Sequence, residues 1–288
     1  MFAFKTFALI AIFNISSAFA FPEAPVNDLG FRPSQFSKSI DTQDYGFEGI
    51  VKLSNCSGSL IQFEGQSDSS KAVVLTNGHC VPKGYFGGML KPGEVIVNKN
   101  VNRSMKIFKD KDTLLSISAT KVIYATMTKT DLALYELSET YQQIKSRTDI
   151  SPFILASQRP TEKTPIEIVS GYWERGYSCA IDAFVDTLKE AEWVFKDSIR
   201  YTSGCDTVGG TSGSPIIETG TREVIAINNT ANESGQKCTL NNPCEVNETG
   251  TISSVKGLRY GQQTYQIYSC LTNDQKLDLN LTGCDLQK

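Results

Sequence analysis

Histidine is nearly absent from this sequence: His79 is the only one in 288 residues. A zinc site with two histidine ligands, including that of the H-E-x-x-H metalloproteases, is therefore excluded. His79 is also the only side chain whose ordinary pKa suits proton transfer near neutral pH. Acid–base chemistry at that pH is therefore expected around one position of the chain.

An excess of charge of one sign is also lacking. Lys and Arg together number 28 and Asp and Glu 31, which gives a net charge of −3. This balance offers no electrostatic case for binding nucleic acid or an anionic membrane. Glycine (22) and proline (10) are too few for a collagen-like or low-complexity chain. With 40% apolar and 20% charged residues, the composition predicts globular structure, in one large domain or two small ones.

The sequence has no apolar run long enough to span a bilayer. Its first apolar run, Phe7–Ile15, follows Lys5 and precedes Ala18-Phe-Ala20. A cationic residue, a short apolar stretch and an A-x-A site in this order are typical of a secretory signal peptide. We therefore expect residues 1–20 to be removed after Ala20 and the chain to have no membrane anchor. The predicted location is secreted, either extracellular or periplasmic.

The cysteines form no C-x-x-C pair, which argues against a zinc or redox motif. All eight follow the predicted signal peptide, at positions 56, 80, 179, 205, 238, 244, 270 and 284. In an exported protein this number predicts up to four disulfides. Eight cysteines allow about 105 pairings, and cysteine spacing alone does not select among them.

Short apolar runs separated by turn residues begin near residue 46. Their lengths and their β-branched content predict strands. The runs cover residues 49–53, 58–61, 71–76, 94–97, 121–125, 131–137, 166–169, 180–185, 193–195, 215–217 and 224–227. Many short strands, almost no helix and no repeat of about 20–50 residues favour an all-β barrel or sandwich over a solenoid or propeller.

Three segments lie outside these strands. Residues 21–45 hold three prolines and no helical periodicity, so we expect an extended arm or a propeptide. Residues 141–157 form a polar connector, in which residues 142–149 are compatible with a short helix. Residues 266–288 are expected to be a C-terminal extension stapled by its own disulfide.

His79 follows a predicted strand, in the segment Leu75-Thr-Asn-Gly-His-Cys-Val81. Cys56 precedes the neighbouring strand, and because a hairpin joins the two strands, Cys56 and Cys80 are able to face each other. A disulfide between them would fix the turn that carries His79. A lone histidine is otherwise most often an ordinary surface or core residue, and this interpretation stays open at the level of the segment.

A glycine-rich segment, Gly209-Gly-Thr-Ser-Gly-Ser-Pro215, precedes another predicted strand. A nucleophilic serine needs an exposed hydroxyl beside N–H groups that bind a developing oxyanion. Ser212 has suitable surroundings, since Gly210 has no Cβ to restrict its conformation. The N–H groups of Gly210 and Ser212 would be the two donors. The alternative is an ordinary turn of Gly and Ser.

Asp131 stands at the head of the apolar run that ends at Leu137. A buried carboxylate at this point is suited to accept a hydrogen bond from the Nδ1–H of His79 and so to fix the tautomer of the imidazole. The alternative is an aspartate that caps the end of a strand, which is common.

Taken together, these segments resemble the trypsin-like (chymotrypsin-fold) serine endopeptidases. The histidine box is Thr76-Asn-Gly-His-Cys80, the aspartate box is Asp131-Leu-Ala-Leu134 and the nucleophile box is Gly210-Thr-Ser-Gly-Ser-Pro215, while Cys56-Ser-Gly-Ser-Leu-Ile61 resembles the first cysteine strand. The order His, Asp, Ser is the chymotrypsin order, whereas an α/β-hydrolase places its histidine last. Bacterial members, including glutamyl endopeptidases, are the most similar in style. The resemblance covers roughly residues 46–230.

The resemblance implies an all-β fold of two packed six-stranded antiparallel β-barrels, residues 46–140 and 158–265, with the active site between them. It implies a secreted serine endopeptidase in which Ser212 attacks the peptide carbonyl, His79 transfers the proton and Asp131 orients the imidazole. Gly210 and Ser212 would form the oxyanion hole, and neither a metal nor a cofactor would be required. A polypeptide substrate and a protein inhibitor are the expected partners, with no nucleic acid, and we expect a monomer.

The sequence also departs from the family. Thr211 stands where digestive relatives carry an aspartate that pairs with a newly formed N-terminus, and no Ile-Val-Gly-Gly start is present. Activation by insertion of a new N-terminus is therefore not expected in that form. Two alternatives to an active enzyme follow: a catalytically inactive protease-like binding protein, and a zymogen held inactive by residues 21–45.

The resemblance suggests residues of the substrate pocket as well. Asp206 lies six residues before Ser212, where trypsin carries the carboxylate that selects Lys or Arg. Ile227 and Asn228 would form another wall of the pocket. Glutamyl relatives usually use a second histidine there, and this chain has none. A preference for Lys or Arg before the scissile bond is one interpretation, and a structural, solvent-bonded Asp206 is the other.

We expect four disulfides and prefer one set of pairs. Cys56–Cys80 is the first choice, followed by Cys179–Cys205, Cys238–Cys244 and Cys270–Cys284, while Cys205–Cys238 is a competing pair. Trp173 and Trp193 are expected in the core, where large aromatic side chains are mostly buried.

Overall fold

A computed structural model describes residues 45–83 and 88–288. The predicted signal peptide, and all but the last residue of the predicted arm at residues 21–45, lie outside the described residues. The described part of the chain forms fifteen strands, one α-helix and two 3₁₀-helices. None of its helices is long and apolar enough to cross a membrane.

The first barrel is a closed ring of antiparallel strands. Its strands are β1 (Ile50–Lys52), β2 (Ser57–Phe63), β3 (Lys71–Thr76), β4 (Val95–Phe108), β5 (Leu114–Thr126) and β6 (Leu132–Thr140). They follow one another in the order β1-β4-β5-β6-β3-β2, and the ring closes because β1 also pairs with β2. Neighbouring residues of β2 belong to two different buried clusters, so both of its faces are covered.

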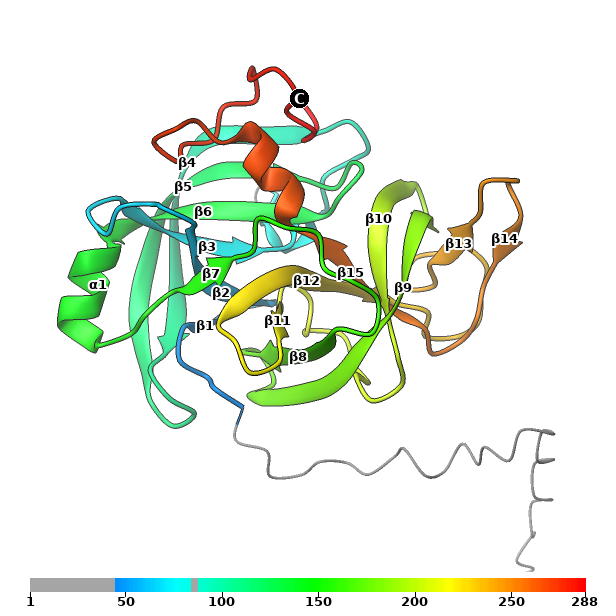
Figure 1. Cartoon of the computed structure of the whole chain (residues 1–288), viewed down its shortest axis with the longest axis horizontal. Coiled ribbons are helices and arrows are strands. Elements are labelled where there is room, and N and C mark those ends of the chain that lie inside the picture. The colour runs from blue at the N-terminus through cyan, green and yellow to red at the C-terminus, as the bar shows by residue number, and fades with distance from the viewer. Residues whose placement is uncertain (1–44, 84–87) are drawn as a thin grey trace, which may run out of the picture. The chain divides into compact units, whose positions relative to one another are not determined.

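The second barrel repeats this arrangement. Its strands are β8 (Pro165–Ser170), β9 (Arg175–Glu190), β10 (Trp193–Tyr201), β11 (Pro215–Glu218), β12 (Glu223–Ala231) and β15 (Arg259–Gln263). Their order is β12-β11-β8-β9-β10-β15, and pairing of β12 with β15 closes the ring. Two closed rings of six antiparallel strands confirm the expected all-β fold (Figure 1).

The segment between the barrels contains α1 (Tyr141–Thr148) and β7 (Phe153–Leu155). The helix is stabilised at its start by a capping box, in which Thr140 and Gln143 exchange side-chain to backbone hydrogen bonds. It matches the short helix expected at residues 142–149 to within one residue. β7 runs parallel to both β2 and β12, and so joins a strand of each barrel.

The last part of the chain returns to the first barrel. After β13 (Cys244–Val246), β14 (Ile252–Ser253) and β15, the 3₁₀-helix η3 (Tyr265–Cys270) leads into the C-terminal segment, drawn in orange to red beside β4 and β5 (Figure 1). Ile267 and Leu286 are buried in one cluster with Phe108 and Tyr124 of the first barrel. The Tyr124 hydroxyl also donates to the backbone carbonyl of Gln287 at 3.0 Å. The predicted extension is therefore part of the packed structure.

All eight cysteines are paired. The bridges are Cys56–Cys80, Cys179–Cys205, Cys238–Cys244 and Cys270–Cys284. This is the expected set, and the competing pair Cys205–Cys238 is wrong. The Cys238–Cys244 bridge closes a short loop before β13, whereas the Cys270–Cys284 bridge closes the C-terminal segment.

Two expectations from the sequence need correction. Strands β4, β5 and β9 are longer than the apolar runs that predicted them, because many of their side chains face solvent and are polar. Trp193 is buried, as expected, but Trp173 is wrong as a core residue, since 49% of it is exposed.

Candidate active site

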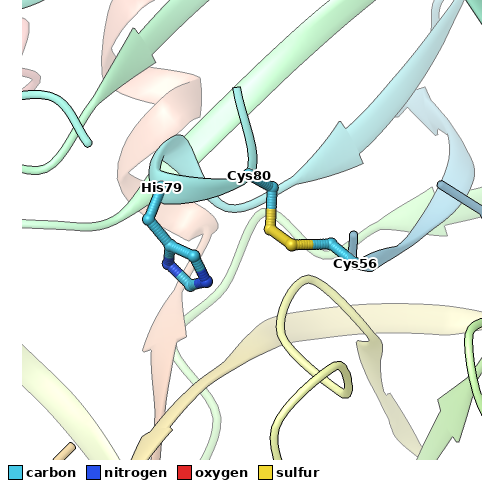
Figure 2. A group of neighbouring side chains, drawn as sticks. All are labelled: Cys56, His79 and Cys80. Carbon is cyan, nitrogen blue, oxygen red and sulfur yellow. A yellow bond between two sulfur atoms is a disulfide. The ribbon is translucent and has the colours of Figure 1, made fainter. Parts of the chain in front are cut away.

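His79 lies in a one-turn 3₁₀-helix, η2 (Gly78–Cys80), directly after β3. A Cβ on Gly78 would lie 2.0 Å from the backbone oxygen of Thr126, so only glycine allows this turn to approach β5 so closely. Cys80 joins the turn to Cys56, and Figure 2 shows the imidazole beside this bridge. Both the disulfide and the tight packing therefore fix the backbone position of His79.

Asp131 binds His79 through both of its carboxylate oxygens, one on the imidazole and one on the backbone. Its Oδ2 lies 2.6 Å from Nδ1 of His79, and its Oδ1 accepts a hydrogen bond of 3.0 Å from the backbone N–H of the same residue. The Asn77 side-chain amide donates to the backbone carbonyl of Asp131 at 2.8 Å. Asp131 is only 1% exposed. A carboxylate held in this way orients the ring and favours the tautomer with a proton on Nδ1, which leaves Nε2 free to accept one.

The environment also sets the proton affinity of His79. Burial lowers its pKa, but the charge of Asp131 and the hydrogen bond to it act in the opposite direction, with a smaller contribution from Glu190. The balance raises the pKa of His79 above its ordinary value. An imidazole with a raised pKa is a stronger base, so it accepts a proton from a hydroxyl group more readily.

Ser212 is the second residue of a tight turn that follows directly on another tight turn. The turn at residues 208–211 is closed by a backbone hydrogen bond of 3.0 Å and has Gly210 at its third position, with φ of 90°. The turn at residues 211–214 is closed by a bond of 3.0 Å and has Gly213 at its third position, with φ of 78°. A positive φ at the third residue is typical of a type II turn and favours glycine. The two glycines therefore shape the backbone on either side of Ser212.

Both barrels hold the Ser212 segment. The Ser212 carbonyl accepts a 2.8 Å hydrogen bond from the N–H of Ser57 in the first barrel. On the other side, Gly213 N–H donates to the Asn228 carbonyl at 2.9 Å. The Ser212 hydroxyl itself donates to the backbone carbonyl of Asn229 at 3.3 Å. The serine backbone is thus fixed, while its hydroxyl is held by one long hydrogen bond.

One cavity brings these groups together. It has a volume of about 90 Å³, and His79, Asp131 and Ser212 all contribute to its lining. Asn228, another residue expected from the sequence, also lines it. The three segments that suggested a triad are thus neighbours in the structure, although they lie far apart in the chain.

Two of the expected pocket residues do not line this cavity. Asp206 is directed to solvent, with 76% of its side chain exposed, and forms an ion pair of 3.1 Å with Arg259. Ile227 is fully buried in a hydrophobic cluster between Pro215 and Gln262, its partners on the neighbouring strands. Asp206 thus has the exposed, paired position that the structural interpretation expects, and its role in specificity stays a prediction.

Glu190 is a cavity residue that the sequence did not indicate. It is 6% exposed, lines the cavity with His79, and accepts a hydrogen bond of 2.7 Å from the backbone N–H of Asn241. Burial raises the pKa of Glu190, although hydrogen bonds from Thr230 and Asn241 oppose this effect. Glu190 lies at the end of β9, in a stretch of alternating polar residues without any motif, so no sequence signal identified it.

Cys56, His79 and Cys80 also form a group whose ligand atoms lie within 4.8 Å of one another (Figure 2). Both cysteines are bound to each other as a disulfide. Because zinc and similar metals bind the thiolate form, this group does not offer a metal site as it stands.

Comparison with known proteins supplies the family. The model of the family described as "Trypsin-like peptidase domain" matches residues 56–227, which is more than half of the chain. The chain belongs to this family. The matched range begins at Cys56 and contains all three candidate catalytic residues of this trypsin-like chain. No curated protein matches this chain.

Several solved structures are similar to this trypsin-like chain at low identity. The protease domain of MamO from Magnetospirillum magneticum is 13% identical, with a TM-score of 0.48, over 79% of this chain and 97% of that one. A Glu endopeptidase is 15% identical, with a TM-score of 0.42, over 75% and 85% of the two chains. A protease from Nocardiopsis is 14% identical, with a TM-score of 0.42, over 75% and 91%.

Proposed function

We propose that this trypsin-like chain is a secreted serine endopeptidase that cleaves polypeptides through Ser212, His79 and Asp131. The observation that carries the proposal is the 2.6 Å contact between His79 Nδ1 and Asp131 Oδ2 in a cavity that Ser212 also lines. Membership of the family supports hydrolysis of peptide bonds as the reaction.

In the proposed mechanism, rotation about the Cα–Cβ bond of Ser212 releases its hydroxyl from the Asn229 carbonyl and turns it toward the imidazole. Hydrogen bonds between catalytic groups are often long or misaligned until substrate binds. His79 Nε2 accepts the hydroxyl proton as Ser212 Oγ forms a bond to the substrate carbonyl carbon. The imidazolium is stabilised by Asp131 and then gives its proton to the leaving amine as the C–N bond breaks.

The acyl-enzyme is hydrolysed by the same groups. His79 takes a proton from a water molecule, which attacks the ester carbon, and returns the proton to Ser212 Oγ as the product acid leaves. In both steps negative charge develops on the carbonyl oxygen. We assign the N–H groups of Gly210 and Ser212 as its donors, a role to which glycine at position 210 is suited by its φ of 90°.

An inactive, protease-like binding protein is the second candidate. It is favoured by the Ser212 hydroxyl, which donates to the Asn229 carbonyl rather than to the imidazole. It is also consistent with Thr211, whose hydroxyl donates to the backbone carbonyl of Val208 within the turn before the serine. In this alternative the cavity binds a polypeptide segment without cleaving it.

Cleavage of a mixed peptide library by the exported chain, followed by mass spectrometry, tests the proposal. The endopeptidase predicts internal cleavage that Ser212→Ala and His79→Ala both abolish. Binding of library peptides without cleavage, in the wild type and in a chain trimmed to residues 46–288, would favour the binding protein. Cleavage only after trimming would assign an inhibitory role to residues 21–45.

The remaining properties are part of the same proposal. Four disulfides are consistent with an oxidising compartment, which supports secretion. A polypeptide substrate and a protein inhibitor are the proposed partners, and a monomer is the proposed state. Specificity for Lys or Arg is not part of the proposal, since Asp206 is paired with Arg259 outside the cavity.

A further inference from the structure

Trp173 is a large aromatic residue with an unusual position beside the candidate oxyanion hole. It is 49% exposed, yet its indole Nε1–H donates a hydrogen bond of 2.7 Å to the backbone carbonyl of Gly209. Gly209 and Gly210 are the two central residues of the turn at residues 208–211. The indole therefore binds the peptide group that carries the N–H of Gly210.

This peptide group has two available orientations. Type I and type II turns are closed by the same hydrogen bond, and they differ by a flip of the central peptide. The turn has the type II form, with Gly210 at φ of 90°. Glycine at both central positions makes either form accessible, and a Cβ on Gly209 would meet nothing within 4 Å. The turn sequence by itself therefore does not hold the peptide in one orientation.

The hydrogen bond from Trp173 distinguishes the two orientations. In a trans peptide the C=O and the N–H point in opposite directions. When the Gly209 carbonyl points to the indole, the Gly210 N–H must point away from it. After a flip the carbonyl would lose this donor, and it would turn its lone pairs to the side on which the N–H had been.

Buried hydroxyl groups hold Trp173 in place. Its backbone N–H donates to Ser170 Oγ at 3.2 Å, and that oxygen lies 3.0 Å from Ser57 Oγ. Ser57 Oγ in turn accepts the N–H of Tyr172 at 3.1 Å. Both serines are fully buried. The rings of Tyr172 and Trp173 meet edge to face at 5.1 Å, and a Cβ on Gly210 would lie 2.8 Å from the first and 3.0 Å from the second.

We propose that Trp173 is a positioning residue for the oxyanion hole. Its indole N–H holds the Gly209–Gly210 peptide in the orientation that leaves the Gly210 N–H available to a developing oxyanion. The inference rests on the proposed function, and Trp173 acts through the peptide without touching the reacting atoms. Its loss lets the peptide populate the flipped form, in which a carbonyl oxygen repels the oxyanion.

Replacement of the indole N–H by sulfur, with 3-benzothienylalanine at position 173, removes the donor and keeps the ring. Trp173→Phe is a second variant. The measurement is the second-order rate of labelling of the exported chain by a fluorophosphonate, whose P=O oxygen occupies an oxyanion hole. Because one hydrogen bond contributes about 1 kcal/mol net, we expect labelling about fivefold slower for both variants. With a peptide substrate, kcat falls by about the same factor while KM is unchanged.

Tyr124→Phe is the matched control, since it removes one donor to a backbone carbonyl, that of Gln287, at a distance from the site. It is expected to label at the wild-type rate. Labelling of the Trp173 variants at that rate would overturn the inference and leave the proposed function intact, as would an equal loss in Tyr124→Phe. A loss that appears only as a raised KM would also overturn it. A wild-type chain that takes no label overturns the proposed function, and the role of Trp173 with it.

Discussion

Removal of the Cys56–Cys80 disulfide is expected to damage the candidate site more than the fold. Cys80 follows His79 directly, and Cys56 precedes Ser57, whose N–H holds the Ser212 carbonyl at 2.8 Å. One bridge therefore supports the segments of both the candidate base, His79, and the candidate nucleophile, Ser212. The perturbation is the double variant Cys56→Ala and Cys80→Ala, because alanine places no unpaired hydroxyl at these buried positions.

The loss of stability follows from the length of the loop that each bridge closes. Cys56 and Cys80 are 24 residues apart, and Cys270 and Cys284 are 14 apart. The chain-entropy relation gives about 3.5 kcal/mol for the first bridge and about 3 kcal/mol for the second. Removal of either bridge should therefore lower the free energy of unfolding by nearly the same amount.

The assay compares urea unfolding with the rate of fluorophosphonate labelling under conditions where each variant remains folded. The variant without Cys56–Cys80 and the corresponding double variant Cys270→Ala and Cys284→Ala should each lose about 3 kcal/mol of unfolding free energy. Labelling should fall at least tenfold only without Cys56–Cys80, because a small displacement of the base or the nucleophile reduces the rate by about 10- to 100-fold. Equal labelling rates in the two folded variants would refute the supporting role of this bridge.

Three further predictions concern the cavity and its margins. The charge of Glu190 raises the pKa of His79, so Glu190→Gln should move the acidic limb of the kcat/KM profile to lower pH, and an unmoved or higher limb would contradict this. In Gly213→Ala the new Cβ would lie 2.2 Å from a first-barrel side chain at a φ of 78°, whereas in Gly220→Ala, at a φ of 81°, it would meet nothing within 4 Å. Urea unfolding should therefore show a loss of about 1–2 kcal/mol for Gly220→Ala and a clearly larger loss for Gly213→Ala. Asp206→Ser should leave the cleavage profile of a peptide library unchanged, and loss of a preference for Lys or Arg would return Asp206 to the pocket.

The parts of the site that lie in short, continuous segments could be predicted from the sequence. The turn with His79 and Cys80 follows one strand of a hairpin, so its proximity to Cys56 is a local property. The nucleophile segment is recognisable because glycines are needed where φ is positive, at Gly210 and Gly213. The contact between Asp131 and His79 joins distant segments, and it was expected mainly from the resemblance to the family.

Polar residues inside the fold explain much of what was missed. β15 contains Gln262 and Gln263, which are 0% and 2% exposed, so its sequence is not that of an apolar strand. The buried amide of Gln262 is satisfied because it donates to Ser198 Oγ at 3.1 Å. The buried amide of Gln263 is satisfied in the same way by the Asp197 carbonyl, at 2.7 Å. Such partners come from another strand, and the local sequence does not indicate them.

The direction in which a loop side chain points could not be predicted from the sequence either. Asp206 has the expected distance from Ser212 along the chain, but its carboxylate is exposed and pairs with Arg259 of β15 at 3.1 Å. Glu190 shows the reverse case, since the backbone N–H of Asn241 satisfies a carboxylate at a buried position. In each case the deciding partner is distant in the sequence.

The central claim is that Ser212 is a nucleophile activated by His79. Its most direct test is the intact mass and peptide map of the chain without residues 1–20 after reaction with a fluorophosphonate. The account predicts one added phosphonyl group, mapped to Ser212, and no addition in His79→Ala or in Ser212→Ala. A wild-type chain that stays unlabelled, or that is labelled at another residue, would contradict it.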